Sequence, residues 1–222
     1  KRSLFTIPKQ TLDSSPSEKL REETVGCRLR LKRLSMTTGF DAATKENIAN
    51  QLGMNNKKNA ISGGHKIYDV ANEHIKQHNE FFNRVEGYWK SMTLPLAAVN
   101  TDEVSTEGGV RLLKRTDAEL FHTRMVAFES ESKTLTQTLN MNRAVIIDEA
   151  MAMLGPRFDA RKYPDEFALS IHWGFPAVDV PNYLADLAPA AYEHERLLIA
   201  KRFEDTYELA SMAMLQELQA VM

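Results

Sequence analysis

Residues 121–154 read FHTRMVAFESESKTLTQTLNMNRAVIIDEAMAML, a stretch without glycine or proline. Its apolar side chains recur at intervals of three, four or seven residues, as Phe121, Met125, Phe128, Leu135, Leu139, Ile146 and Met153. A spacing near 3.5 residues predicts a long helix that buries one seam against another helix. A cap at Thr116 or Asp117 and a stop at Gly155 and Pro156 place this helix at about 117–154.

The seam has two explanations that the sequence leaves open. A second chain covers it in a homo-oligomer, or another helix of the same chain covers it. We expect a homo-oligomer, with an interface formed by the seam residues Phe121, Met125, Phe128, Leu135 and Leu139.

Two further segments have helical periodicity, at about 66–90 and 183–221. From Val25 the sequence alternates instead, with Cys27 and Leu29 on one face and basic residues on the other, which is typical of a half-buried strand. The apolar run 110–113 is a candidate partner strand, and the residues after Pro164, through Ser170 or His172, favour a short helix. The sequence therefore predicts a mainly α fold of the α+β class, a long helical hairpin or bundle with a small β element near the N-terminus.

The first 24 residues mix Ser, Pro, Lys and Glu with little periodicity, so we expect a flexible N-terminal arm at 1–24. Residues 25–222 then form a single helix-rich domain. The 222-residue chain is 43% hydrophobic, enough for a core, and carries 28 Lys and Arg against 30 Asp and Glu. This near-neutral balance gives no global attraction to nucleic acid.

The sequence also indicates the cellular compartment of the protein. One cysteine, Cys27, excludes an internal disulfide and points to a reducing compartment. No run reaches the roughly 20 apolar residues that a membrane span needs, and residues 1–9 lack the apolar core of a signal peptide. We expect a cytoplasmic protein without membrane contact.

The strongest indication of function is a row of basic side chains on one face of the first predicted strand. Alternation places Arg28, Arg30 and Lys32 on one strand face, with Arg33 next in line, and Lys57 and Lys58 extend the predicted patch. Such a strip suits a phosphate backbone, in single- or double-stranded DNA. Basic strand faces also protect sheet edges or pair with acidic neighbours, and this alternative stays open.

Patterns for catalysis and metal binding are weak. His74 and His78 have the i, i+4 spacing that lets two imidazoles share a metal, but Ile75 stands where a zinc protease carries glutamate. Core packing explains these histidines better. Cys27 has no recognisable base beside it, and the acidic pairs lack a surrounding motif. We therefore predict no catalytic residue, no metal and no cofactor.

Three short strings suggest a relationship: Thr93-Leu94-Pro95, Gly109-Val110-Arg111-Leu112-Leu113, and Leu154-Gly155 with Phe158 followed by Tyr163-Pro164. Over about residues 25–187 the chain resembles a family of uncharacterised proteins from bacteriophages and integrative elements. The resemblance implies a bacterial host cell and a setting near phage recombination functions or MoxR-type AAA+ ATPases. It carries over no catalytic residue.

We therefore expect a non-enzymatic phage or mobile-element protein that oligomerises through long helices and contacts nucleic acid in replication, recombination or genome handling. The alternative is a protein-only assembly factor, either a virion component or an adaptor of an AAA+ ATPase. A metal-dependent enzyme using His74 and His78 is a third hypothesis.

Overall fold

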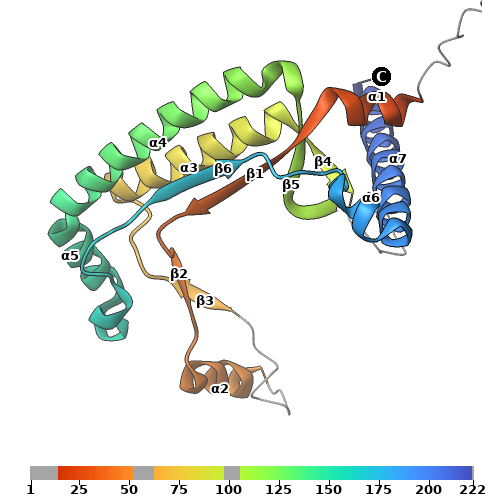
Figure 1. Ribbon diagram of the computed structural model, residues 1–222. Coiled ribbons are helices and arrows are strands. Elements are labelled where there is room, and N and C mark those ends of the chain that lie inside the picture. Colours follow the sequence, from red (N-terminus) through yellow and green to blue (C-terminus); the bar gives the residue numbers. More distant parts are fainter. Residues whose placement is uncertain (1–14, 53–62, 98–105, 222) are drawn as a thin grey trace, which may run out of the picture. The chain divides into compact units, whose positions relative to one another are not determined.

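A computed structural model describes residues 15–52, 63–97 and 106–221 of the chain (Figure 1). Most of these residues are helical, and two antiparallel sheets complete the fold. The prediction of a mainly helical α+β protein is confirmed.

The larger sheet has the strand order β4–β5–β1–β6. Its strands are β1 (Thr24–Lys32), β4 (Thr93–Ala97), β5 (Thr106–Lys114) and β6 (Ser170–Gly174). In the antiparallel β1–β5 pair, Cys27 lies opposite Arg111 and Gly26 opposite Leu112. The expected pairing of the 110–113 run with the first strand is therefore confirmed.

The predicted position of the β element near the N-terminus is wrong, because the strands are spread through the chain. β4 directly follows a helix, and β6 lies at the end of the segment that the sequence favoured as a short helix. Both strands are only five residues long. In such short segments, pairing with distant partners decides the conformation more than local propensity does.

The smaller sheet pairs β2 (Thr37–Gly39) with β3 (Gly64–Lys66). Helix α2 (Ala42–Gln51) follows β2. It begins at Asp41, whose Oδ1 accepts a 2.7 Å hydrogen bond from the backbone N–H of Thr44. This is the cap that the sequence predicts, since an aspartate side chain can satisfy a free N–H of the first turn.

Helix α3 (Glu73–Met92) begins later than the expected start at about residue 66. Residues 64–66 pair as β3, and Asn72 caps the helix by accepting a 3.1 Å hydrogen bond from Ile75 N–H. The same side chain donates a 2.7 Å bond to Glu149 Oε2. Asn72 therefore fixes both the start of α3 and its attachment to a second helix.

The expected helix 117–154 is present as two helices, α4 (Ala118–Met141) and α5 (Arg143–Leu154). The interruption is at Asn142, whose side-chain amide donates a 2.8 Å hydrogen bond to the carbonyl of Thr138. The backbone bonds from Asn142 N–H to Thr138 O and from Ile146 N–H to Asn142 O are both kept at 3.1 Å, so the interruption is confined to this residue. Short 3₁₀ turns lie before α4 (Arg115–Asp117) and after α5 (Gly155–Arg157 and Ala160–Lys162).

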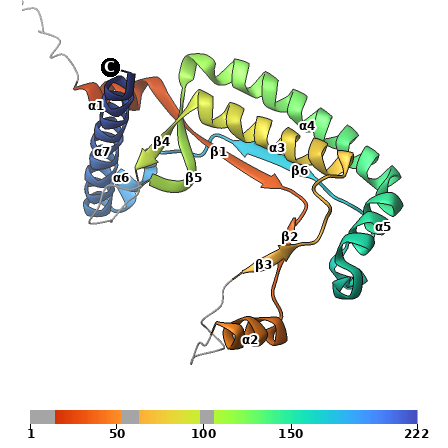
Figure 2. The same cartoon turned by 180° about the vertical axis from the view of Figure 1, so that it is seen from behind.

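At the carboxyl side, the expected helix 183–221 is divided into α6 (Tyr183–Leu187) and α7 (Pro189–Val221). At the amino side, residues 16–23 of the expected arm form helix α1 (Pro16–Glu23). Ser15 and Glu18 form a reciprocal capping box at its start. α1 and α6 both pack against α7 (Figure 2).

The chain divides into two compact units. Unit 1 comprises the described residues of 1–30, 88–124 and 173–222, and unit 2 those of 31–87 and 125–172. Each unit has an apolar cluster of its own. That of unit 1 contains Leu96, Val110, Leu112, Ile199 and Phe203. That of unit 2 contains Leu34, Ile67, Tyr68, Ile75, Leu139, Ile146, Ala150, Tyr163 and Phe167.

Candidate nucleic-acid interface

The predicted basic face lies on β1. Alternation along the strand places Arg28, Arg30 and Lys32 on the same side, opposite to the buried Cys27. Arg30 and Lys32 are exposed, and within the described ranges neither has an ion pair or a side-chain hydrogen bond. These two cations are therefore available to a ligand.

Arg28 has a different environment, because it lines a hollow of about 200 Å³ against α7. Two carboxylates line the same hollow, Asp179 and Glu195, and Asp179 is already bound by Arg21 at 2.7 Å. Arg28 is half-buried here. Arg28 is therefore less accessible than Arg30 and Lys32, which are exposed.

Residue 26 is a glycine, which lets the 176–178 segment lie close to β1. A Cβ at Gly26 would lie 2.5 Å from the carbonyl oxygen of Pro176 and 2.7 Å from Val178 Cγ1. Neither distance is sterically acceptable, so any larger residue would push the 176–178 segment off the strand. The glycine thereby sets how closely this segment approaches Arg28.

The remaining predicted basic residues do not join this pair. Arg33 forms an ion pair with Glu86 of α3, and its guanidinium lies 5.5 Å from the ring centre of Phe82. That geometry gives Arg33 a packing role in unit 2. Lys57 and Lys58 lie outside the described residues.

The predicted oligomer interface lies largely inside the chain. Phe121, Met125, Phe128 and Leu139 are at most 1% exposed. Rings of α3 and α4 meet at this seam, with Phe81 and Phe128 6.2 Å apart and Tyr88 and Phe121 5.9 Å apart. Packing within one chain therefore accounts for the apolar character of these four residues.

Leu135, the fifth predicted interface residue, lines a groove of about 510 Å³ between α3 and α4. An ion pair between Arg84 and Glu131 borders the groove. The Arg84 guanidinium also lies 5.6 Å from the ring centre of Phe81 and 5.9 Å from that of Phe128. Charged and aromatic groups of the two helices are thus paired across this groove.

Of the two histidines, His78 has structural contacts, whereas His74 Nδ1 is shielded from solvent without a hydrogen-bond partner among the described residues. His78 is buried, and its Nε2 accepts a 3.1 Å hydrogen bond from Leu34 N–H. Its Nδ1 lies 3.0 Å from Asn79 Oδ1, so the Nδ1–H form is the one that satisfies both contacts. Burial lowers the pKa of His78, with Arg33 acting in the same direction and the Asn79 bond opposing it. Both ring nitrogens are engaged, and no trio of metal-ligating side chains occurs among the described residues.

Sequence reasoning missed the role of Arg111, a half-buried arginine on β5. Arg111 donates from Nε to Thr93 Oγ1 and from a terminal nitrogen to Thr93 O, both at 2.7 Å. Its guanidinium lies 5.4 Å from the ring centre of Trp89. Burial raises the pKa of the neighbouring Cys27 to about 11, although Trp89 and Arg111 oppose the shift. Cys27 is therefore a neutral core thiol at physiological pH.

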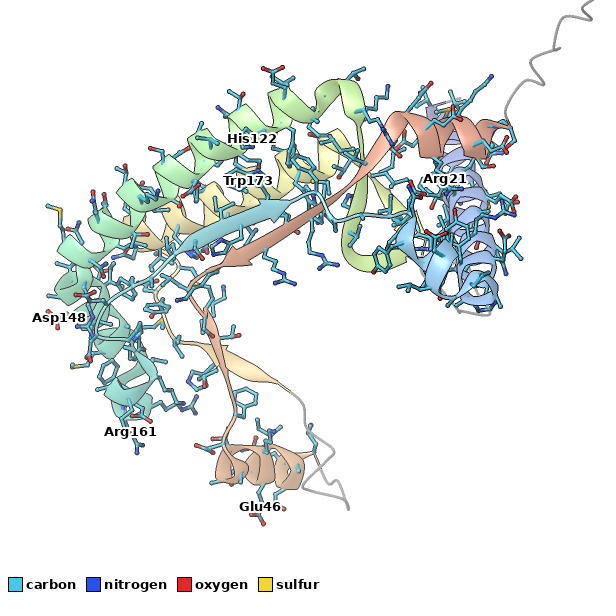
Figure 3. All side chains as sticks on the ribbon, viewed as in Figure 1. Arg21, Glu46, His122, Asp148, Arg161 and Trp173 are labelled. Atoms are coloured by element: carbon cyan, nitrogen blue, oxygen red, sulfur yellow. The ribbon has the colours of Figure 1, made fainter. Side chains whose placement is uncertain are left out.

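The rings of His122 and Trp173 lie 5.9 Å apart in unit 1 (Figure 3). Trp173 is only partly exposed. This contact places Trp173 in local packing against α4.

Comparison with known proteins gives no match to a protein family, to a curated protein or to a solved structure. Within residues 15–52, 63–97 and 106–221, no helix has the length and apolar composition needed to cross a bilayer.

Proposed function

We propose that this chain is a non-enzymatic protein of a phage or mobile element that contacts nucleic acid in replication, recombination or genome handling. The observation that carries the proposal is the exposure of Arg30 and Lys32 on one side of β1, without an ion-pair partner in the described part of the chain. Unpaired cations on one strand face can follow the charges of a phosphate backbone.

The geometry of a strand supports this assignment. Side chains two residues apart on a strand repeat at about 6.6 Å. A row of cations with this spacing can follow one phosphate backbone, so Arg28, Arg30 and Lys32 would contact the same strand.

The expected affinity is modest. Three phosphate contacts give a slope of log affinity against log salt of about −2 for single strands and about −3 for duplex. Self-association raises the affinity of such a weak site, because several copies engage one strand at once. We propose that the protein acts on nucleic acid as a homo-oligomer.

Two observations support a role without catalysis. The raised pKa of Cys27 removes the most nucleophilic side-chain type from consideration, because a buried neutral thiol is unreactive. His78 is occupied by Leu34 and Asn79 and cannot act as a free base.

The test is fluorescence anisotropy with a labelled single-stranded 30-mer and its duplex at low and moderate salt. The triple variant R28E/R30E/K32E should lose at least tenfold in affinity and should flatten the salt dependence. The variant K76E/K114E/K201E changes the net charge equally at exposed sites elsewhere and should retain binding. Wild-type affinity in R28E/R30E/K32E would exclude the proposed interface.

A second candidate is a protein-only assembly factor, such as a virion component or an adaptor of an AAA+ ATPase. The observation that favours it is on α7, which is anchored by Ile199, Phe203 and Thr206 but exposes large apolar side chains beyond them. Met214 is 65% and Leu218 56% exposed. Exposed apolar side chains in such density usually mark an interaction surface.

This candidate is tested by size exclusion with light scattering. M214E/L218E should disperse the assembly, because the two side chains lie one turn apart on α7. Q216E/Q219E adds the same charge at polar positions of that helix and should leave the assembly intact. An assembly that depends on Met214 and Leu218 in a chain indifferent to DNA would favour the protein-only role over the leading proposal.

A further inference from the structure

Unit 2 contains a hollow of about 420 Å³ that has no part in the β1 interface. It is bordered by the β2–β3 sheet, the first turn of α2 and the segment 156–162 that follows α5. The hollow therefore brings together parts of the chain that are more than 90 residues apart. Its volume lies within the range of about 300–1,000 Å³ that is typical of small-molecule sites.

Aromatic rings form part of the wall. Phe40 and His65 are stacked, with ring centres 6.1 Å apart and an interplanar angle of 24°. Phe158 lines the hollow as well, and its ring is held by stacking on Tyr163 at 5.1 Å. These flat surfaces favour a ligand that contains a planar ring.

The two carboxylates of the hollow are already engaged. Asp41 caps α2 through Thr44, and this hydrogen bond lowers the pKa of Asp41. Asp159 accepts two hydrogen bonds from the Arg161 side chain, at 2.9 and 3.1 Å, and a third from Arg161 N–H at 3.1 Å. Figure 3 shows Arg161 on the segment after α5. Neither carboxylate therefore needs a further cation.

Other polar groups of the hollow remain unmatched. Arg157 and Lys162 are exposed, and neither forms an ion pair or a side-chain hydrogen bond among the residues that the structure describes, although the charge of Lys162 helps to lower the pKa of Asp41 and Asp159. The Nε2 atom of His65 is shielded from solvent, and no hydrogen-bond partner for it is found there. A shielded ring nitrogen without a partner costs free energy that a ligand would recover.

We propose that this hollow binds a nucleoside phosphate, with its base against Phe40 and His65 and its phosphate held by Arg157 and Lys162. His65 Nε2 can bond to a polar edge of the base, as donor or acceptor according to its tautomer. Inorganic phosphate alone would leave the aromatic wall and His65 unused. A base and a phosphate together use all of these groups.

The ligand is either a free nucleotide or one nucleotide of a single strand. Both offer the same chemistry to the hollow. The inference does not rest on the β1 interface, because Arg28, Arg30 and Lys32 line no part of the hollow.

Isothermal titration of the full chain with 5′-AMP, adenosine and inorganic phosphate tests the proposal. 5′-AMP should bind at least tenfold more tightly than either fragment. R157A/K162A should weaken 5′-AMP binding at least tenfold, since two charge-assisted contacts are lost. F40L should weaken 5′-AMP and adenosine but leave phosphate unchanged.

The control K76A/K133A removes two exposed lysines elsewhere in unit 2 and should bind 5′-AMP normally, as should R28E/R30E/K32E. Circular dichroism of each variant establishes that it is folded. No binding of 5′-AMP at millimolar concentration, or full binding by a folded R157A/K162A, would overturn the site.

Titration with a short oligo(dA) separates the two sources. Oligo(dA) binding that R157A/K162A weakens assigns the hollow to a nucleotide within a strand. Binding of 5′-AMP but not of oligo(dA) assigns it to a free nucleotide. Either result supports the site.

Discussion

The stability of unit 2 depends on the protonation state of the His78 imidazole. Its Nε2 accepts the Leu34 N–H, so protonation would place two N–H groups against each other. Because the folded-state pKa is below the ordinary value of about 6.5, the unfolded chain binds the proton more readily. The stabilisation is present above about pH 6.5 and is lost as the pH falls below it.

We predict that the free energy of unfolding, measured with urea, decreases between about pH 7 and pH 5. H78Q should be less stable than the native chain at pH 7 by about 1–3 kcal/mol, because it disturbs the hydrogen bond from Leu34 N–H. The stability of H78Q should vary less with pH than that of the native chain. H172Q, at an exposed position, is the control. An equal acid dependence in H78Q and the native chain would contradict the assignment.

The buried thiol of Cys27 makes the stability of the fold depend on pH in the alkaline range. The folded thiol, with a pKa of about 11, keeps its proton above the pH at which the unfolded thiol ionises near 9. The stability contribution is therefore complete below about pH 9 and is lost as the pH rises towards 11, by up to about 3 kcal/mol. C27A should reduce this alkaline loss. In the native chain at neutral pH, a thiol reagent should react with Cys27 only after urea is added.

Among the secondary-structure elements, α3 depends most clearly on its cap. N72A should cost roughly 2 kcal/mol in thermal or urea unfolding, because it removes both the bond to Ile75 N–H and the bond to Glu149. N72S should restore the cap but not the bond to Glu149, and should recover about half of the loss. Equal stability of N72A and N72S would show that the cap contributes little.

The sequence predicted the helix and strand boundaries that depend on local signals, and it missed those that depend on distant partners. Alternation around Cys27 predicted β1, and Asp41 predicted the start of α2, because both signals are local. The start of α3 and the existence of β6 depend on partners far along the chain. The interruption at Asn142 lies within an otherwise continuous apolar pattern, so the spacing of apolar residues does not indicate it.

Among the described residues, the apolar cluster around Phe203 in unit 1 and the one around Ile146 in unit 2 share no residue. F203A should cost about 3–5 kcal/mol in unit 1, and I146A about 2–5 kcal/mol in unit 2. Hydrogen exchange should place the faster-exchanging amides of each variant mainly in the unit that carries the substitution. Uniform acceleration through both units in both variants would contradict two separate clusters.

The candidate sites differ in how far the sequence predicts them. The basic face of β1 is visible because Arg28, Arg30 and Lys32 alternate within five residues. The hollow around Phe40 and His65 was not predicted, since Arg157 and Lys162 come from a distant segment. No local pattern links these parts of the chain. The predicted interface residues were recognised as a seam, but the sequence does not show which partner covers them.

The pairing of β1 also has a consequence during synthesis of the chain. Thr24 leaves the ribosome long before its partner Lys114. At 5–20 residues per second, β1 waits about 5–20 s for β5, and longer for β6. During that interval both strand edges and the Cys27 face lie open to other nascent chains. We expect Arg28, Arg30 and Lys32 to repel neighbouring copies of the same strand over this period, because charged side chains on an open strand discourage edge-to-edge pairing.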